Sequence, residues 1–284
     1  MPEVIQLFSN PAAGRHRRRA IAALVKAFEA QGATVLRSES SAGMPVIAAE
    51  ATHVCVAGGD GTVRHVGDAV VRAGHPVTMS IYPAGTINLL AREAGYPRDP
   101  AAFATLVLSG PARRKHFPVA MAGGHFFACA SVGPDSLAVA RVSRRLKQAI
   151  GRIAYGIAAL KLLYDWQRVG IVLEVGERNV ACEAFYVAKA RYYAGGWSFA
   201  RDARVNEPVL HVVALRTARR RDYLAFLAVL AAGRDVSKLA NVVSFTCSTL
   251  RAEAAAPLPI QADGDVVGTM PATIALREDP LIFC

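Results

Sequence analysis

GGDGT, at residues 58–62, is the most informative stretch of this sequence. It follows the apolar run 53–57, which is typical of a buried strand, and precedes a stretch of helical character over 63–72. Its glycines allow a ligand to approach the backbone closely, and the first amides of the next helix are available to an anion. The order strand, glycine turn, helix therefore predicts a phosphate-binding turn.

Asp60 stands in the middle of this turn. A carboxylate is a poor phosphate binder, because like charges repel. We therefore expect Asp60 to handle a proton or a metal ion beside the phosphates. The alternative is an ordinary strand-to-helix turn in which Asp60 only caps the following helix.

Two more turns of this kind follow predicted strands. SNPAAG at 9–14 comes after the strand at 4–8, and PAGTIN at 83–88 comes after the strand at 77–82. Open α/β sheets bind ligands at the carboxyl ends of their strands, so we expect the three turns to build one pocket. In that setting Asn10 and Asn88 are expected to contact the ligand, although Asn also suits turns for structural reasons alone.

The pattern of elements changes near residue 118. Before it, strands at 4–8, 34–38, 53–57 and 77–82 alternate with helices at 17–30, ahead of residue 53, at 63–72, at 88–94 and through 108. This predicts an α/β domain over 1–117, with a mostly parallel sheet covered by helices on both faces. After it, the β-like segments predict an antiparallel β-sandwich over 118–284, whose tail could pack back on the first domain: 119–132, 170–175, 183–189, 209–215, 242–250 and 273–276.

The composition predicts a globular protein with well-packed hydrophobic cores and without a membrane-spanning helix. The chain has 284 residues, of which 53% are hydrophobic. No run reaches the roughly 20 apolar residues that a span requires, and the nearest candidate, 223–232, is expected to be a core helix. The N-terminus enters an apolar strand directly, so no secretory signal is expected. Five widely spaced cysteines in apolar segments indicate reduced thiols in a cytosolic protein.

The net charge of +11 points to an acidic partner. Nucleic acid is disfavoured because no zinc-finger, RNP or heptad pattern accompanies the charge. Basic residues cluster at 15–19 and at 141–152, the latter in an amphipathic helical stretch. Such helices often lie on membrane interfaces, which predicts a peripheral protein at an anionic membrane surface; the alternative is an ordinary solvated face.

NPAAG, GGDGT and PAGTINLLAREAGYP resemble the diacylglycerol kinase catalytic-domain family, which includes bacterial lipid kinases and the sphingosine kinases. GGDGT also occurs in NAD kinases, but PAGTxN and the QxDG element at 261–264 favour the lipid kinases. The resemblance extends over the whole chain, through 131–135, 151–155, 192–196 and 261–265.

This resemblance implies an ATP- and Mg²⁺-dependent kinase that phosphorylates a hydroxyl of a lipid such as diacylglycerol or a sphingoid base. ATP would bind the first domain, the lipid head group would enter between the domains, and Asp135 would contact the lipid. The residues implied to hold the nucleotide are Asn10, Pro11, Gly58, Gly59, Gly61, Thr62, Gly85, Thr86 and Asn88.

Two acids compete for the role of general base. In sphingosine-kinase-like members it is the Asp of GGDGT, here Asp60, and in some bacterial members it is the Asp of the distal element, here Asp263. Phosphoryl transfer needs positioning, charge neutralisation and one group that accepts the alcohol proton. Asp265 would bind metal. Without the resemblance, Asp263 would be interpreted as part of an Asp-Gly hairpin turn.

Several positions depart from the family pattern. His65 and Asp68 replace a Glu and an Asn, Asp265 replaces a Glu, and Lys189 stands where the family has Asn. Residues 206–208 read Asn-Glu-Pro where Asp-Asp-Gly holds a structural metal in some members. These changes weaken that metal site. They leave open a catalytically impaired nucleotide- or lipid-binding member or a soluble NAD-kinase-like enzyme, and the sequence singles out neither one lipid nor an oligomeric state.

Overall fold

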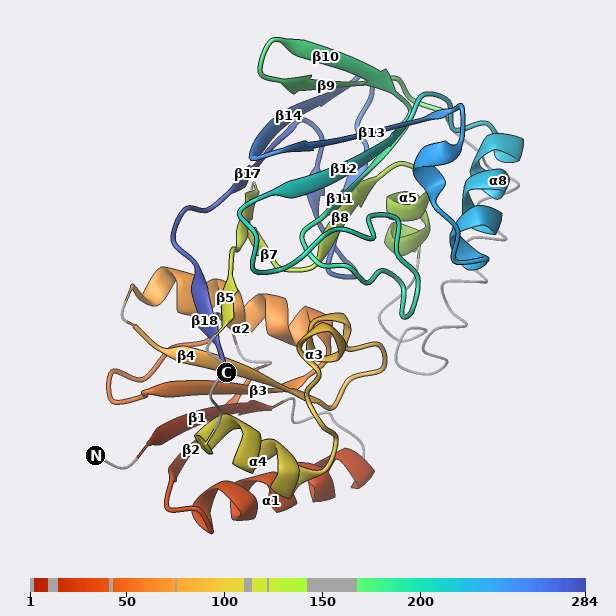
Figure 1. The fold of residues 1–284 in the computed structure, drawn as a ribbon. Coiled ribbons are helices and arrows are strands. Elements are labelled where there is room, and N and C mark those ends of the chain that lie inside the picture. Colours follow the sequence, from red (N-terminus) through yellow and green to blue (C-terminus); the bar gives the residue numbers. More distant parts are fainter. Residues whose placement is uncertain are drawn as a thin grey trace. The chain divides into compact units, whose positions relative to one another are not determined.

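The computed structural model describes residues 3–9, 15–40, 43–74, 76–109, 114–121, 123–141 and 168–284. The chain divides into two compact units, residues 1–116 with 279–284 and residues 117–278 (Figure 1). Asn10, Pro11, the basic segment 142–152 and the motif at 151–155 lie outside the described residues.

The first unit contains a six-stranded sheet of order β2-β1-β3-β4-β18-β5. Its first four strands are parallel: β1 (Val4–Ser9), β2 (Thr34–Glu39), β3 (His53–Gly58) and β4 (Thr78–Pro83). The chain end supplies β18 (Leu281–Phe283), which pairs parallel with β4 and antiparallel with β5 (Arg114–His116).

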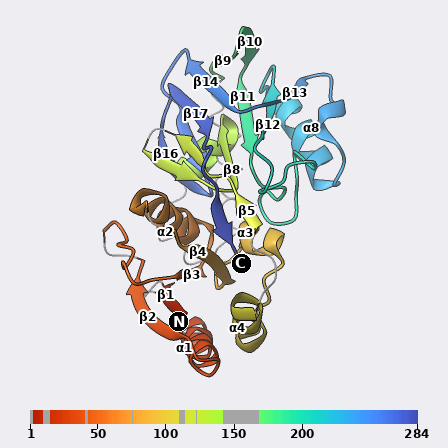
Figure 2. The ribbon, with the colours of Figure 1, turned by 60° about the vertical axis from the view of Figure 1, so that its left-hand side comes forward.

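Helices cover both faces of this sheet, as predicted. In Figures 1 and 2, α1 (Arg15–Glu29) and α4 (Pro100–Ser109) lie on one face and α2 (Asp60–Ala73) and α3 (Leu89–Ala94) on the other. Every residue of the central strand β3 is buried, which explains the apolar sequence that follows His53.

The helix expected ahead of residue 53 is wrong for residues 43–52, which contain none. Gly43 has a φ of +68° and Pro45 lacks an amide hydrogen, so neither residue favours helix here.

The second unit contains two antiparallel six-stranded sheets. The first has the order β10-β9-β14-β17-β6-β7. Its strands are β6 (Val119–Met121), β7 (Gly124–Phe126), β9 (Ile171–Val175), β10 (Arg178–Cys182), β14 (Thr249–Ala254) and β17 (Ala272–Leu276). The second has the order β13-β12-β11-β8-β15-β16. Its strands are β8 (Cys129–Val132), β11 (Ala184–Ala188), β12 (Leu210–Leu215), β13 (Val242–Cys247), β15 (Pro259–Ala262) and β16 (Asp265–Thr269).

Strand β11 shows how the sandwich is filled. Phe185 and Val187 belong to a core cluster shared by both sheets, while the alternate residue Tyr186 packs with residues of helix α8 (Arg220–Ala231). This period of two is that of a strand buried on both faces. Helix α5 (Pro134–Arg141) and the short helix η1 (Val236–Lys238) complete the described elements of this unit.

Two predicted segments are divided differently. The expected strand at 242–250 is two strands, β13 and β14, which belong to different sheets. The expected hairpin at 119–132 is the β6–β7 hairpin followed by β8 in the other sheet. No Gly or Pro marks the corner at Ser248, so the apolar pattern runs through it.

Among the described helices, none combines the length and apolar character needed to span a membrane.

Candidate functional site

The GGDGT turn joins β3 to α2, as predicted. Gly59 is the N-cap residue, and the helix begins at Asp60, three residues earlier than expected. The Thr62 side chain lies over Gly58, where an added Cβ would come within 2.6 Å of the Thr62 Cβ. Glycine at position 58 is therefore required by the first turn of the protein's own helix.

The turn after β4 packs directly on the GGDGT turn. A Cβ on Gly85 would lie 2.3 Å from the Cα of Gly59, so the two turns are in backbone contact. Because β3 and β4 are adjacent parallel strands, this contact lies at the edge of the sheet where ligands bind. The structure thus brings together two of the three predicted turns; Asn10 of the third turn is not described.

Asn88 shapes the second turn from within. It is 4% exposed and left-handed, with a φ of +55°. Its Oδ1 accepts from the Gly85 amide at 2.8 Å and its Nδ2 donates to the Gly85 carbonyl at 2.9 Å. The side-chain amide is therefore used by the turn itself, whereas the neighbouring Thr86 is exposed.

Asp60 links the two turns through its carboxylate. The Oδ1 atom accepts from the Leu89 amide at 2.7 Å, so Asp60 caps α3 and not the helix in which it lies. Burial raises the pKa of Asp60, and the surrounding amides, Leu89 first, oppose that shift. A carboxyl group with a raised pKa is better suited to accept a proton near neutral pH than an ordinary Asp.

The two departures on α2 are engaged in contacts within the protein. His65 Nε2 lies 2.8 Å from the Gly43 carbonyl oxygen, and Asp68 forms an ion pair with Arg72 at 2.9 Å. His65 thus ties α2 to the segment that precedes β3, and Asp68 forms its ion pair within α2.

Asp263 lies in the turn between β15 and β16, with φ values of +48° for Asp263 and +87° for Gly264. Its carboxylate is 4% exposed and accepts from three amides: Phe127 at 2.8 Å, Ala128 at 2.9 Å and Cys129 at 3.1 Å. A carboxylate has about four lone-pair positions, so most of its acceptor capacity holds the 127–129 segment.

Asp135 is the second residue of α5, and its carboxyl group contacts a cluster of aromatic side chains through Tyr193. The Ser131 hydroxyl donates to its carboxylate, Tyr193 is a second hydrogen-bond partner, and burial raises the pKa of Asp135. Tyr186 and Tyr223 extend this network through their hydroxyls, 3.2 Å apart. Sequence reasoning singled out Asp135 but missed the tyrosines, whose spacing along the chain gives no sign of their meeting.

The acids present fit only one kind of magnesium site. Among the described residues, no three Asp, Glu, His or Cys side chains gather, and Asp265 lies half-buried at the start of β16 without two such neighbours. Magnesium in kinases is held by one or two carboxylates together with substrate phosphates. Among the described residues, the acidic side chains do not form a complete protein cage for a metal ion.

The metal that the resemblance implies near 206–208 does not fit this chain. Asn206 and Glu207 are exposed, and the main-chain carbonyl of Glu207 accepts a hydrogen bond from the Lys189 ammonium at 2.7 Å. A buried ammonium at these oxygens would repel a metal ion.

Comparisons with known proteins cover both units. The diacylglycerol kinase catalytic domain matches residues 5–117, and the YegS C-terminal NAD kinase beta sandwich-like domain matches residues 128–282. The structure of a putative diacylglycerol kinase from Bacillus anthracis str. Sterne has a TM-score of 0.81 at 17% identity, covering 99% of this chain and 96% of that one. The fold class is therefore confirmed: an α/β unit with a parallel sheet and an antiparallel β-sandwich.

Two curated relatives are similar in sequence. A "Probable lipid kinase YegS-like" protein of Pseudomonas aeruginosa is 31% identical over 73% of this chain and 68% of its own length. A "Diacylglycerol kinase" of Bacillus subtilis is 22% identical over 94% of this chain and 91% of its own length. The sandwich match alone spans more than half of the 284 residues. The chain belongs to the diacylglycerol kinase family of lipid kinases.

Proposed function

We propose that this protein is an ATP- and Mg²⁺-dependent kinase that phosphorylates a hydroxyl of a lipid such as diacylglycerol or a sphingoid base. The observation that carries the proposal is the backbone contact between Gly59 and Gly85, which sets the Asp60 carboxyl group at the N-termini of two helices. The names of the relatives, a probable lipid kinase and a diacylglycerol kinase, support a lipid as the acceptor.

The glycine turns bind and orient the nucleotide. Helix N-termini favour anions, so the amides around Gly61 and Thr62 hold phosphates, and the turn at Gly85 and Thr86 borders them, with Asn10 and Pro11 on the third turn. Magnesium, when bound, neutralises charge on the phosphates.

Asp60 accepts the proton of the lipid hydroxyl in this mechanism. Its Oδ1 accepts a hydrogen bond from the Leu89 amide, and the Asp263 carboxylate accepts hydrogen bonds from the amides of residues 127–129. The raised pKa favours Asp60 as the acceptor. Asp263 then fixes the 127–129 segment, and Asp135 contacts the lipid.

The proposal is tested by incubating the protein with γ-labelled ATP, Mg²⁺ and a total lipid extract and identifying the labelled product. Asp60→Asn should lower transfer by about two to four decades, because the amide cannot accept the proton. Asp68→Asn on the same helix is the matched control and should retain activity. A labelled soluble nucleotide in place of a lipid would contradict the choice of substrate.

A catalytically impaired member is the second candidate, and the family departures at His65 and Asp68 favour it. For this candidate, ATP would raise the melting temperature while no lipid in the extract became labelled. Transfer to any lipid by the wild type, lost in Asp60→Asn, would eliminate this alternative.

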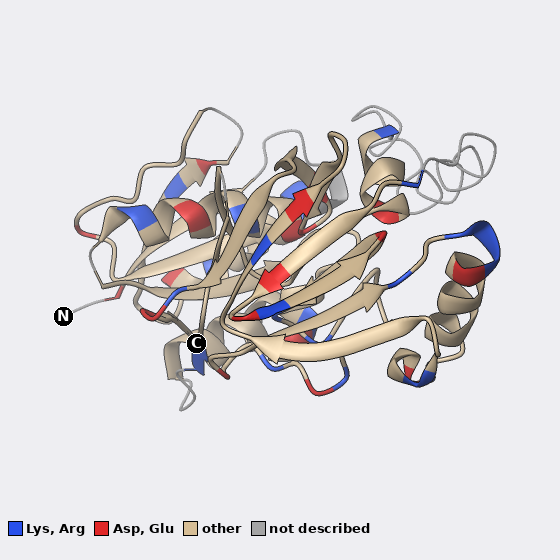
Figure 3. Cartoon of the chain, turned by 90° about the horizontal axis from the view of Figure 1, so that it is seen from above, with Lys and Arg blue, Asp and Glu red and all other residues tan. Residues whose placement is uncertain are grey.

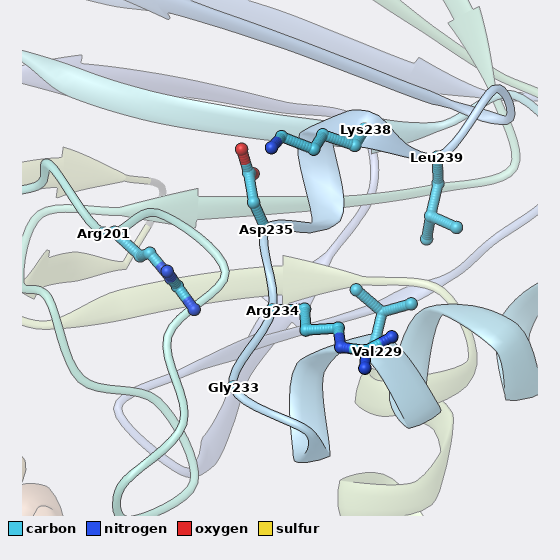
Figure 4. Close-up of a pocket in the computed structure, with 7 residues that line it drawn as sticks. All are labelled: Arg201, Val229, Gly233, Arg234, Asp235, Lys238 and Leu239. Atoms are coloured by element: carbon cyan, nitrogen blue, oxygen red, sulfur yellow. The ribbon is translucent and has the colours of Figure 1, made fainter.

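A basic cavity supports docking on an anionic membrane. Its volume is about 410 Å³, and it lies between the end of α8 and the loop at Arg201 (Figure 4). Three cations, Arg201, Arg234 and Lys238, line it against the single carboxylate of Asp235. Ser237 and then the nearby cations lower the pKa of Asp235, so the carboxylate stays charged and the lining keeps an excess of positive charge.

Lys and Arg residues occur in both units (Figure 3), so the cavity needs a specific test. Co-sedimentation with phosphatidylglycerol-containing vesicles should weaken several-fold in the double variant Arg234→Gln/Lys238→Gln. Arg178→Gln removes one exposed charge from the β9–β10 hairpin and should have little effect. An equal loss of binding per removed charge in the two variants would show that net charge, and not this cavity, governs docking.

A further inference from the structure

Lys189 is an unusual lysine because its side chain is completely buried. It follows the last residue of β11 and is 0% exposed. A buried charge is costly unless polar groups compensate it. Its Nζ donates at 2.7 Å to the main-chain carbonyls of Arg204 and of Glu207, and it lies 5.9 Å from the centre of the Phe117 ring.

The segment 201–208, here named the carbonyl loop, turns its main chain toward cationic side chains. Besides the two carbonyls that face Lys189, those of Arg201 and Ala203 accept from the Arg204 guanidinium at 2.8 and 2.9 Å. Four carbonyl oxygens of one short loop thus face positive charge. Main-chain carbonyls are also the oxygen ligands that proteins use to hold metal ions.

The carbonyl loop is tied to the start of the second unit and to the Asp263 turn. The Phe117 amide donates to the Val205 carbonyl at 3.3 Å. The Lys189 amide donates to the Ala128 carbonyl at 2.8 Å, and the Ala128 amide in turn donates to Asp263. Lys189 is therefore hydrogen-bonded directly to the segment that the Asp263 carboxylate holds.

We propose that the Lys189 ammonium is the resident cation of the carbonyl loop, so that this loop keeps its fold without a metal ion. The carbonyls of Arg204 and Glu207 are directed at the ammonium, which already supplies the positive charge that a metal would bring. Magnesium is then required only with the nucleotide. This inference concerns the second unit alone and stands whether or not the proposed lipid is the substrate.

The experiment compares thermal unfolding of nucleotide-free wild type, Lys189→Asn and Lys115→Asn, each in EDTA and in millimolar MgCl₂ or CaCl₂. The wild type should melt at the same temperature in all three buffers. Lys189→Asn should melt lower in EDTA, by about 2–10 °C, and regain part of the loss with a divalent ion, since a neutral side chain leaves the carbonyls open to it. Lys115 is exposed, so Lys115→Asn should behave as the wild type.

Two results would overturn the proposal. One is a wild type that loses stability in EDTA and regains it with Mg²⁺ or Ca²⁺. The other is a Lys189→Asn protein as stable as the wild type in EDTA.

If Lys189→Asn cannot be obtained folded, the metal content of nucleotide-free wild type decides. Less than about one tenth of an equivalent after gel filtration without chelator supports a resident ammonium, and one equivalent of bound divalent ion contradicts it.

Discussion

The turns at Asp60 and at Asp263 have similar sequences and different structures. Each is an Asp followed by Gly after a buried strand, in GGDGT and in QADGD. Asp60 begins a helix and caps a second helix through the Leu89 amide, whereas Asp263 has a φ of +48° and binds three amides of one segment. An Asp-Gly pair can thus begin a helix and link two turns or anchor a loop, and the backbone conformation of the Asp, helical at Asp60 and left-handed at Asp263, distinguishes the two.

The GGDGT turn depends on close backbone packing, which Gly85→Ala should break. The new Cβ would lie 2.3 Å from the Gly59 Cα and 2.5 Å from the Asn88 Oδ1, so both turns must move. Overpacking of this kind costs about 1–3 kcal/mol. At the pocket this corresponds to ATP binding weakened about ten- to hundredfold, measured by calorimetry. Gly170→Ala is the control, because a Cβ at that position would have no atom within 4 Å. Unchanged ATP affinity in Gly85→Ala would show that the two turns do not bind the nucleotide.

The Asp263 turn depends on its carboxylate, and Asp263→Asn should destabilise the protein. The amide group can keep one oxygen acceptor, but its NH₂ must then face an amide of the 127–129 segment, donor against donor. Leaving such a buried donor unsatisfied costs about 1–3 kcal/mol. Urea unfolding should show the loss, and the exposed Asp202→Asn should not. Equal stability of Asp263→Asn and the wild type would refute the anchoring role.

The Asp→Asn substitution that destabilises the protein at position 263 should leave its stability nearly unchanged at position 60. In Asp60→Asn the amide oxygen still accepts from Leu89, so the free energy of unfolding should stay close to that of the wild type. Asp60→Ala removes the acceptor and should cost about 1 kcal/mol, a typical value for a lost helix cap. If Asn and Ala proved equally destabilising in urea unfolding, the Leu89 hydrogen bond would contribute nothing.

The smallest expected effect is a pH dependence of stability. Burial raises the folded-state pKa of Asp60 above its unfolded value of 3.8, so the folded protein holds this proton more tightly. The stabilisation is fully present below pH 3.8 and is lost as pH rises through the folded pKa. The unfolding free energy of the wild type relative to Asp60→Asn should therefore fall as pH rises through this window. Asp135 shifts in the same direction and cancels in this difference; a rise would contradict the sign.

The sequence contained the local part of this description. Glycines 58 and 59 between an apolar run and a helical stretch predicted β3, the turn and α2, and the Asp-Gly pair at 263–264 allowed the hairpin turn that joins β15 and β16. Both inferences depend on neighbours in the chain, which is where turn chemistry is encoded.

The remainder depends on contacts between distant residues. The sequence allows Asp60 to cap its own helix, but its hydrogen-bond partner, Leu89, lies 29 residues further on. Asp263 reaches amides more than 130 residues away, and the carbonyls that hold Lys189 lie 15 and 18 residues beyond it. Lys189 looked like a departure from a family pattern because nothing near it in the sequence shows that its ammonium is enclosed.

The most direct test measures lipid phosphorylation by Asp60→Asn and Asp263→Asn side by side, at a temperature where circular dichroism shows both variants folded. Asp60→Asn should lose about two to four decades of turnover, while Asp263→Asn should stay within about tenfold of the wild type. The reverse pattern, with Asp60→Asn active and folded Asp263→Asn inactive, would make Asp263 the proton acceptor and contradict the role proposed for Asp60.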